Sequence, residues 1–526
     1  MKTHLRRALP WAVLALCYLM TVGMMALWGT HNINSDMSSE MVLAQLLNEE
    51  GGINSANWYY STELRTFSHV PVLQLGLRLF PNSWATARTF SLAVMLAMAA
   101  ASFIYMGRGA GLRDSAVYAA GLILLPVSET HRYLFSLGGG YIPYVALSAL
   151  IVGVVLRMPQ RRHRLLRLLI AVPLCFWGGL SGVRMPMICG APLLLSCAVE
   201  GFAALRRASS LREALVSEEG VSLLGACVCM AGMMAGYLVN VKVYSRMYSF
   251  DQYGETLMKQ FDVSMFSEQM NRVLAFFGLN TGVPLLSPGA LIDLLMVAVC
   301  ALMLLALAAM LLRRDGMSVQ EKLLVNVTLM AVLLGMLLCG VTGRMKSIYS
   351  AGYYMFGVFL LVLMLLMFIE KRMVCQMQGV RTAAMLVVCG VFLMEGGSFV
   401  RSFMKKEQSE HEEAVEWLVE NGYTRGYATF WNGNVMTELS NGALDVYVYD
   451  AWSDAQLYEW LQRKSHMEEL PEGPVFVYVS DYESYGEEAP CAKEDHLVYA
   501  SARNGSRIYA YDSAQEVAAL HEAGLQ

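Results

Sequence analysis

The sequence predicts a mostly α-helical, polytopic transmembrane bundle with a small α/β domain at its C-terminal end. Of its 526 residues, 56% are hydrophobic and only 16% are charged, which excludes an ordinary soluble globular protein. Many separate apolar runs reach the roughly 20 residues needed to cross about 30 Å of hydrocarbon. Near Arg401 the composition becomes charged, and no spanning run follows. We therefore expect a membrane domain at 1–400 and a second domain at 401–526.

The apolar runs predict about eleven transmembrane spans. The first run lacks a clear small-residue cleavage site and is followed by further spans, so we expect a membrane helix and not a cleaved signal. The apolar segment 69–80 is too short to cross, and we expect it to lie at the interface or to re-enter the membrane. The expected spans are 9–29, 84–106, 115–129, 141–156, 167–183, 186–201, 220–240, 290–312, 322–341, 352–370 and 381–400.

Basic residues mark one side of the bundle. They cluster before the first expected span, from Lys2 to Arg7, and in every second loop after it, as at Arg157 to Arg167. The positive-inside rule places such loops in the cytoplasm. We therefore expect a cytoplasmic N-terminus, an extracytoplasmic C-terminal domain and a location in the cytoplasmic membrane. The net charge of −4 gives no sign of a nucleic-acid partner.

The eleven cysteines do not form a disulfide framework. Nearly all of them fall in expected spans, and the region beyond Arg401 holds only Cys491, which leaves it without a second cysteine to pair with. No CxxC or His/Cys spacing points to zinc, so no metal ligand is assigned.

Residues 401–526 show the alternating pattern of a small α/β domain. β-Branched and aromatic residues predict strands at 427–430, 445–449, 475–479 and 506–511. Helices are expected at 405–421, 453–463 and 514–523.

Asp36 and Glu40 are the most informative residues of the membrane domain. They follow the first span, in a large outside loop at about 30–83. Two acids four residues apart share one helix face, with Cβ atoms roughly 5–6 Å apart. Carboxylates just outside the bilayer suit an enzyme that acts on a lipid-linked substrate, whereas a transporter more often carries acids at mid-membrane. The alternatives are that Asp36 is only a helix N-cap and that Glu40 belongs to a solvated helix face.

Three other outside segments carry polar and aromatic residues. The loop at about 241–289 is long and rich in aromatic residues, and such loops are usually functional or disordered. Arg344 and Lys346 are either cations for a phosphate or interfacial anchors that reach lipid headgroups. Glu129 and His131 either form a second acidic site that faces the same cavity as Asp36 and Glu40, or belong to a surface turn.

The order of these elements resembles the GT-C superfamily of membrane glycosyltransferases, which includes the protein mannosyltransferases and the lipid A aminoarabinose transferase. In the mannosyltransferases the loop acids are adjacent, whereas here three residues separate Asp36 from Glu40. The resemblance covers about the first 200 residues by motif and the remaining spans by topology. Besides the acidic loop, the matching motifs are Trp58-Tyr59-Tyr60-Ser61-Thr62-Glu63, Ser68-His69-Val70-Pro71, Ala87-Arg88-Thr89 and Gly179-Leu180-Ser181-Gly182-Val183-Arg184-Met185-Pro186.

The resemblance implies transfer of a hexose or pentose from a polyprenyl-phosphate donor to an envelope glycan, lipid or protein at the outer face of the membrane. Asp36 would be the base that takes the acceptor proton, with Glu40 as a second carboxylate. Arg344 and Lys346, and less directly Arg184, would bind the departing phosphate.

Four further residues, Tyr60, His69, Glu129 and His131, are candidate substrate-binding residues. For His69 the sequence favours a structural role or a hydrogen bond to substrate over metal ligation. No cofactor is assigned with certainty, and a divalent cation is left open. We expect the C-terminal domain to cover the cavity mouth or to receive the acceptor, with Trp431 to Asn434 as a sugar-binding loop or a turn.

Two other function classes compete with a glycosyltransferase. A polytopic transporter or lipid-linked sugar flippase predicts pseudo-symmetric halves and ionisable residues at the bilayer midplane. A non-catalytic scaffold for envelope assembly would leave the loop acids unexplained.

Overall fold

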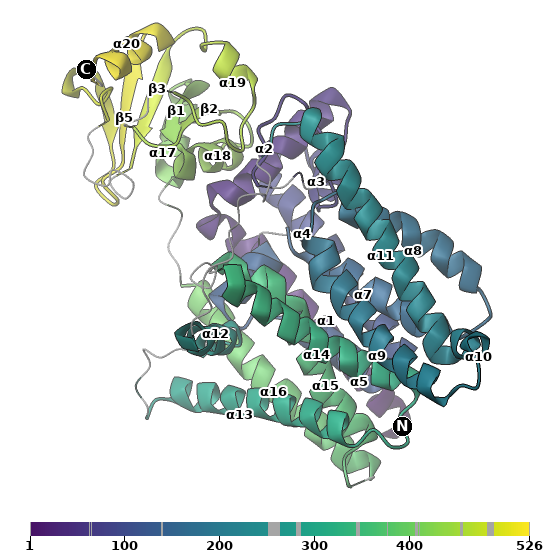
Figure 1. Ribbon diagram of the computed structural model, residues 1–526. Coiled ribbons are helices and arrows are strands. Elements are labelled where there is room, and N and C mark those ends of the chain that lie inside the picture. The colour runs from purple at the N-terminus through teal and green to yellow at the C-terminus, as the bar shows by residue number, and fades with distance from the viewer. Residues whose placement is uncertain are drawn as a thin grey trace.

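The computed structural model shows a helical bundle with a separate α/β domain at one end (Figure 1). This domain lies beside α2 (Ser35–Glu50), and the N-terminus lies at the opposite end of the bundle. The structure describes residues 2–62, 64, 66–137, 140–250, 263–279, 284, 286–342, 348–375, 377–405, 409, 411–452, 456–480 and 489–524.

Eight helical segments of the described chain are long and apolar enough to cross a membrane, so the chain is a multi-pass membrane protein. They contain α1 (Lys2–Trp28), α4 (Trp84–Gly109), α9 (Ala191–Arg207), α11 (Glu218–Lys242), α13 (Pro288–Leu312), α14 (Val319–Thr342), α15 (Ala351–Lys371) and α16 (Gln378–Phe403).

The other three expected spans correspond to shorter helices, α5 (Asp114–Leu124), α7 (Ile142–Leu156) and α8 (Arg164–Gly179). With eleven residues, α5 is only about 17 Å long. Every residue of α5 after Asp114 is buried, and α7 is buried over almost its whole length. Helices that are apolar on all sides are enclosed by other helices, so their length is not set by the hydrocarbon thickness.

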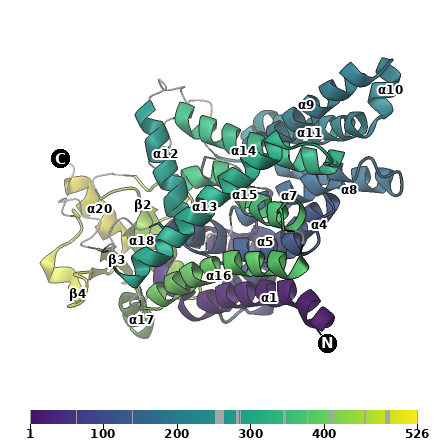
Figure 2. The same cartoon turned by 90° about the horizontal axis from the view of Figure 1, so that it is seen from below.

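The bundle is built around α15, which is buried along nearly its whole length against α5, α13 and α14. On one edge α1 and α16 lie side by side, and α8, α9 and α11 pack together on another (Figure 2). The α8–α11 contact is unusually close, because a Cβ on Gly236 would come within 2.0 Å of the Phe176 carbonyl oxygen. The remaining short helices are α6 (Glu129–His131), α10 (Leu211–Val216) and α12 (Val263–Phe276).

The loop after the first membrane helix folds into α2 and α3 (Val70–Leu79). Only ten residues long, α3 agrees with the expectation of a helix too short to cross. Between the two helices, Trp58 is fully buried in a cluster that also contacts Tyr244, Tyr248 and Phe250. The described start of the aromatic-rich loop at 241–289 is therefore packed onto the first loop.

A five-stranded sheet forms the centre of the C-terminal domain, in the order β2-β1-β3-β5-β4. The strands are β1 (Arg425–Thr429), β2 (Asp445–Tyr449), β3 (Val475–Val479), β4 (Leu497–Ala500) and β5 (Arg507–Tyr511). β1 pairs in parallel with β2 and β3, whereas β5 is antiparallel to β3 and β4. The helices are α17 (Glu412–Glu420), α18 (Phe430–Leu439), α19 (Ser465–Glu468) and α20 (Ala514–Gly524).

Two sequence predictions for this domain are wrong. The helix expected at 453–463 is absent from its described part, 456–463, which runs irregularly along β2, with Gln462 bonded to the Val448 backbone. Trp431 to Asn434 is neither a loop nor a turn but the first turns of α18. The buried Asn432 amide donates to Thr429 and that of Asn434 donates to the Leu461 carbonyl, so neither amide is displayed for a sugar.

Candidate active site

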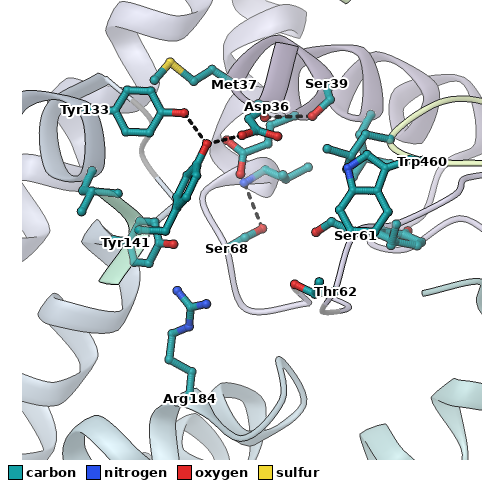
Figure 3. Close-up of a pocket in the computed structure, with 18 of the residues that line it drawn as sticks. Asp36, Met37, Ser39, Ser61, Thr62, Ser68, Tyr133, Tyr141, Arg184 and Trp460 are labelled. Atoms are coloured by element: carbon teal, nitrogen blue, oxygen red, sulfur yellow. Dashed lines mark hydrogen bonds between the residues drawn. The ribbon is translucent and has the colours of Figure 1, made fainter. Parts of the chain in front are cut away.

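A cavity of about 390 Å³ lies between the C-terminal domain and the loops at the adjoining end of the membrane domain. We call it the interdomain cavity. Figure 3 shows the side chains that surround it. Its wall is formed by residues of α2, by Trp58, Tyr60, Ser61, Thr62, Ser68 and Val70, by Tyr133, Leu134, Gly140 and Tyr141, by Arg184, by Tyr349, Ser350 and Tyr353, and by Trp460 and Leu461 of the C-terminal domain.

Asp36 faces this cavity from the first turn of α2. The N-cap of that helix is Asn34, whose side-chain oxygen accepts a hydrogen bond of 3.2 Å from the Met37 amide. The interpretation of Asp36 as the N-cap is therefore wrong, because a neighbouring residue performs that function. The positive end of the helix dipole favours a carboxylate at this position.

A chain of hydroxyl groups holds the Asp36 carboxylate. Tyr349 donates a hydrogen bond to Asp36 Oδ2, and the Tyr133 and Tyr349 hydroxyl oxygens are 2.7 Å apart. The Asn34 amide donates to Tyr133 at 2.7 Å, so Tyr133 in turn donates to Tyr349. Burial, followed by the charge of Asp36, raises the pKa of Tyr133 to about 12, so this phenol stays protonated at neutral pH. Tyr349 is not among the site residues predicted from the sequence, because nothing near it in the chain points to Asp36.

Glu40 also lines the cavity, one helical turn after Asp36. Its Oε2 lies 3.1 Å from Nε2 of the buried His69. His69 itself is behind the cavity wall, at the start of α3. Its position supports the structural alternative, because it can orient Glu40 but does not face a substrate.

Arg184 enters the cavity from the side opposite Asp36 in the view of Figure 3. It is buried, and its guanidinium carbon lies 4.8 Å from the ring centre of Tyr141 and 5.1 Å from that of Tyr353. Aromatic faces stabilise a cation without neutralising its charge. A phosphate in the cavity would therefore meet a positively charged side chain.

Tyr60 presents its ring to the cavity, while its hydroxyl accepts a hydrogen bond of 2.8 Å from the Ser55 amide. The hydroxyl is thus engaged in loop structure, and the ring is the part that can contact a substrate. The two basic residues first expected to bind phosphate, Arg344 and Lys346, lie outside the described residues.

The expectation that Glu129 and His131 face the same cavity is wrong, since neither lines it. Glu129 is half exposed and accepts hydrogen bonds from Arg132 and Asn32. His131 is buried against Phe276, with its Nε2 3.0 Å from the Ile123 carbonyl oxygen. Burial lowers the pKa of His131 to about 4, so the ring is neutral. The segment does reach the site, but through Tyr133.

The C-terminal domain is tied to α2 by a buried ion pair that sequence reasoning did not find. Arg88 of α4 contacts Glu438 of α18 through two hydrogen bonds, of 2.6 and 2.7 Å, and donates a third of 3.0 Å to the Met37 carbonyl. Ala87-Arg88-Thr89 was noticed only as a motif, and no local signal named its partner. The contact links the second domain to the residue next to Asp36.

The cavity offers Asp36 and Glu40 as carboxylate ligands for a divalent cation, the donor type that such cations prefer. Both already contact protein groups, Tyr349 and His69 respectively. Among the described residues, no group of three or more His, Cys, Asp or Glu side chains could hold a metal ion.

Comparison with known proteins identifies the fold. No family model and no curated protein sequence matches the chain. The apo oligosaccharyltransferase of Archaeoglobus fulgidus superimposes with a TM-score of 0.50 at 13% identity, over 90% of this chain and 70% of that one. The chain has a GT-C-like fold.

Two other solved structures are similar at lower scores. ArnT of Cupriavidus metallidurans, bound to undecaprenyl phosphate, gives a TM-score of 0.41 at 11% identity, over 96% of this chain and 97% of that one. The mycobacterial arabinofuranosyltransferase AftD gives 0.48 at 11% identity, over 96% and 40%.

Proposed function

We propose that this protein is a membrane glycosyltransferase that transfers a hexose or pentose from a polyprenyl-phosphate donor to an acceptor hydroxyl. The observation that carries the proposal is one cavity that holds a carboxylate, Asp36, and a buried cation, Arg184. The similarity to the oligosaccharyltransferase fold supports the same class of protein.

The proposed reaction is a single displacement at the anomeric carbon of the donor sugar. The acceptor oxygen forms the new bond to that carbon as the bond to the donor phosphate breaks, and Asp36 takes the acceptor proton. Tyr349 donates a hydrogen bond to one oxygen of Asp36 and so orients the carboxylate that takes the proton. Arg184 stabilises the negative charge on the departing polyprenyl phosphate. Glu40, held by His69, is the second carboxylate that a double displacement would require.

The acceptor is an envelope glycan, lipid or protein that reaches the cavity from beneath the C-terminal domain. Trp460 and Leu461 of that domain form part of the cavity wall, which supports a role for the domain in covering the cavity mouth or receiving the acceptor. The basic loops support a cytoplasmic N-terminus and, with it, a site at the outer face of the cytoplasmic membrane.

Asp36→Asn tests the proposal, because it keeps the shape of the side chain and removes the base. In purified protein reconstituted with a polyprenyl-phosphate sugar and a hydroxyl acceptor, we expect turnover to fall by about 10²- to 10⁴-fold, the usual contribution of a general base. The matched control is Glu49→Gln, which neutralises an exposed acid at the far end of the same helix. Unchanged turnover in Asp36→Asn would remove the mechanism.

A transporter or flippase remains the second candidate because two acids, Asp293 of α13 and Glu395 of α16, are buried in candidate spans. Asp293 lies in the second turn of α13, and Glu395 is eight residues, about 12 Å, from the end of α16. Substrate flux in proteoliposomes that is insensitive to Asp36→Asn would favour this second function.

A further inference from the structure

A second hollow, which we call the α1–α4 groove, lies between two membrane helices and is separate from the interdomain cavity. It has a volume of about 660 Å³ and an almost entirely apolar wall. On α4 its floor consists of small side chains, Ala97, Ala100 and Ala101, which recur on one helix face. Larger side chains of α1, including Trp11 and Leu19, form the opposite wall. The small floor and large walls create a slot open to the lipid.

The two ends of the groove differ in chemistry. At the inner end the Tyr18 hydroxyl donates a hydrogen bond of 3.0 Å to the Ala93 carbonyl and joins α1 to α4. At the other end lies Arg108, whose guanidinium carbon is 5.9 Å from the centre of the Trp11 ring. From Ala97 to Arg108 the helix rises about 16 Å, roughly half of the 30 Å hydrocarbon thickness. The groove thus has the length of one leaflet and a cation at its surface end.

Arginine side chains give this end of the groove a positive charge. Among the described residues, Arg108 forms no ion pair, and it is exposed. A second guanidinium, that of Arg157, lies 3.7 Å from the ring centre of Tyr105, which also lines the groove. Two cations at the mouth of an apolar slot match a lipid with a negatively charged headgroup. An arginine that only contacts lipid headgroups in general would not require an apolar groove beside it.

The position of the groove excludes the polyprenyl-phosphate donor as its occupant. Arg88, which contacts α2 next to Asp36, is in the first turns of α4, whereas Arg108 is in the last. Twenty residues of helix separate them by about 30 Å, the thickness of the hydrocarbon layer. The groove therefore opens to the membrane face opposite the interdomain cavity.

We propose that the α1–α4 groove binds one anionic glycerophospholipid from the leaflet on the N-terminal side, with an acyl chain along the α4 alanines and its phosphate at Arg108. Bound there, the lipid fills the space between α1 and α4 and stabilises their packing. This inference is independent of the proposed catalytic activity, since no residue of the groove lines the interdomain cavity.

Titration of the delipidated full-length protein with phosphatidylglycerol or phosphatidylcholine, followed by native mass spectrometry, tests the proposal. We expect one phosphatidylglycerol per chain to bind more tightly than phosphatidylcholine. Arg108→Gln should weaken phosphatidylglycerol binding roughly five-fold, the effect of one basic residue at a membrane surface. The matched control is Arg206→Gln, since Arg206 also stacks on an aromatic ring, that of Phe202 at 4.5 Å, but lies outside the groove.

A second measurement leaves the charge of the site unchanged. Phosphatidylglycerol with brominated acyl chains should quench tryptophan fluorescence more in the wild-type protein than in Trp11→Phe. Equal affinity for the two lipids, equal effects of the two arginine substitutions, or quenching that does not depend on Trp11 would each overturn the proposal.

Discussion

Removal of the Glu438 carboxylate tests whether the C-terminal domain holds the catalytic helix in place. In Glu438→Leu, the Arg88 cation stays buried without its partner. The two side chains are only 8% and 3% exposed, so water cannot replace the lost contact. Breaking a buried ion pair from one side costs about 3–5 kcal/mol, which corresponds to a roughly 100- to 4,000-fold increase in local opening.

Hydrogen–deuterium exchange of the reconstituted protein measures that opening directly. We expect faster exchange in α18 and in the first turn of α2, because Arg88 joins both. Sugar transfer should fall as well, since the Met37 carbonyl is next to Asp36 in the chain. Replacing both partners, in Arg88→Met with Glu438→Leu, should restore most of the domain stability but not the contact to Met37.

A surface ion pair between the same two regions provides the control. Arg463 and Glu49 are 2.9 Å apart, with side chains 25% and 45% exposed, and such pairs contribute about 0–1 kcal/mol. Glu49→Gln should therefore leave exchange nearly unchanged. Equal exchange in Glu438→Leu and Glu49→Gln, or a double variant no more stable than the single one, would refute the reasoning.

Three other substitutions test the site and the packing. Tyr349→Phe removes the hydrogen bond to Asp36 and should lower kcat about 10- to 100-fold. Tyr133→Phe removes a hydroxyl one step further from Asp36 and should lower kcat less. A larger effect of Tyr133→Phe in steady-state kinetics would contradict the proposed chain of hydroxyl groups. Arg184→Met should raise the KM for the donor by about 10-fold or more, and an unchanged KM would remove Arg184 from the phosphate site. Gly236→Ala forces a Cβ against the α8 backbone and should destabilise the bundle by about 1–3 kcal/mol in thermal unfolding. Gly390→Ala should not destabilise it, because no atom lies within 4 Å of the added Cβ. Equal melting temperatures of the two variants would show that α8 and α11 can separate freely.

Hydrophobic patterning predicted the membrane helices well because the length of an apolar run is a local property of the chain. The short helices α5 and α7 were found, but their burial inside the bundle depends on neighbours that one segment does not reveal. In the C-terminal domain, β2 and β3 match the predicted ranges. Residues 456–463 are irregular and not helical, and Gln462 donates a hydrogen bond to the Val448 carbonyl of β2. β4 and α19 were not predicted.

Sequence alone placed two carboxylates just after the first membrane helix and selected the cavity residues Asp36, Glu40, Tyr60 and Arg184 among its candidates. Tertiary structure decided which groups meet them. Tyr349 is 313 residues from Asp36, and Glu438 is 350 from Arg88, so no spacing rule connects either pair. In the folded chain, His69 does not line the cavity, and His131 packs in an aromatic cluster. The chemistry of each residue and the length of each apolar run can be read from the sequence. The contacts between distant segments form only when the bundle and the second domain pack together.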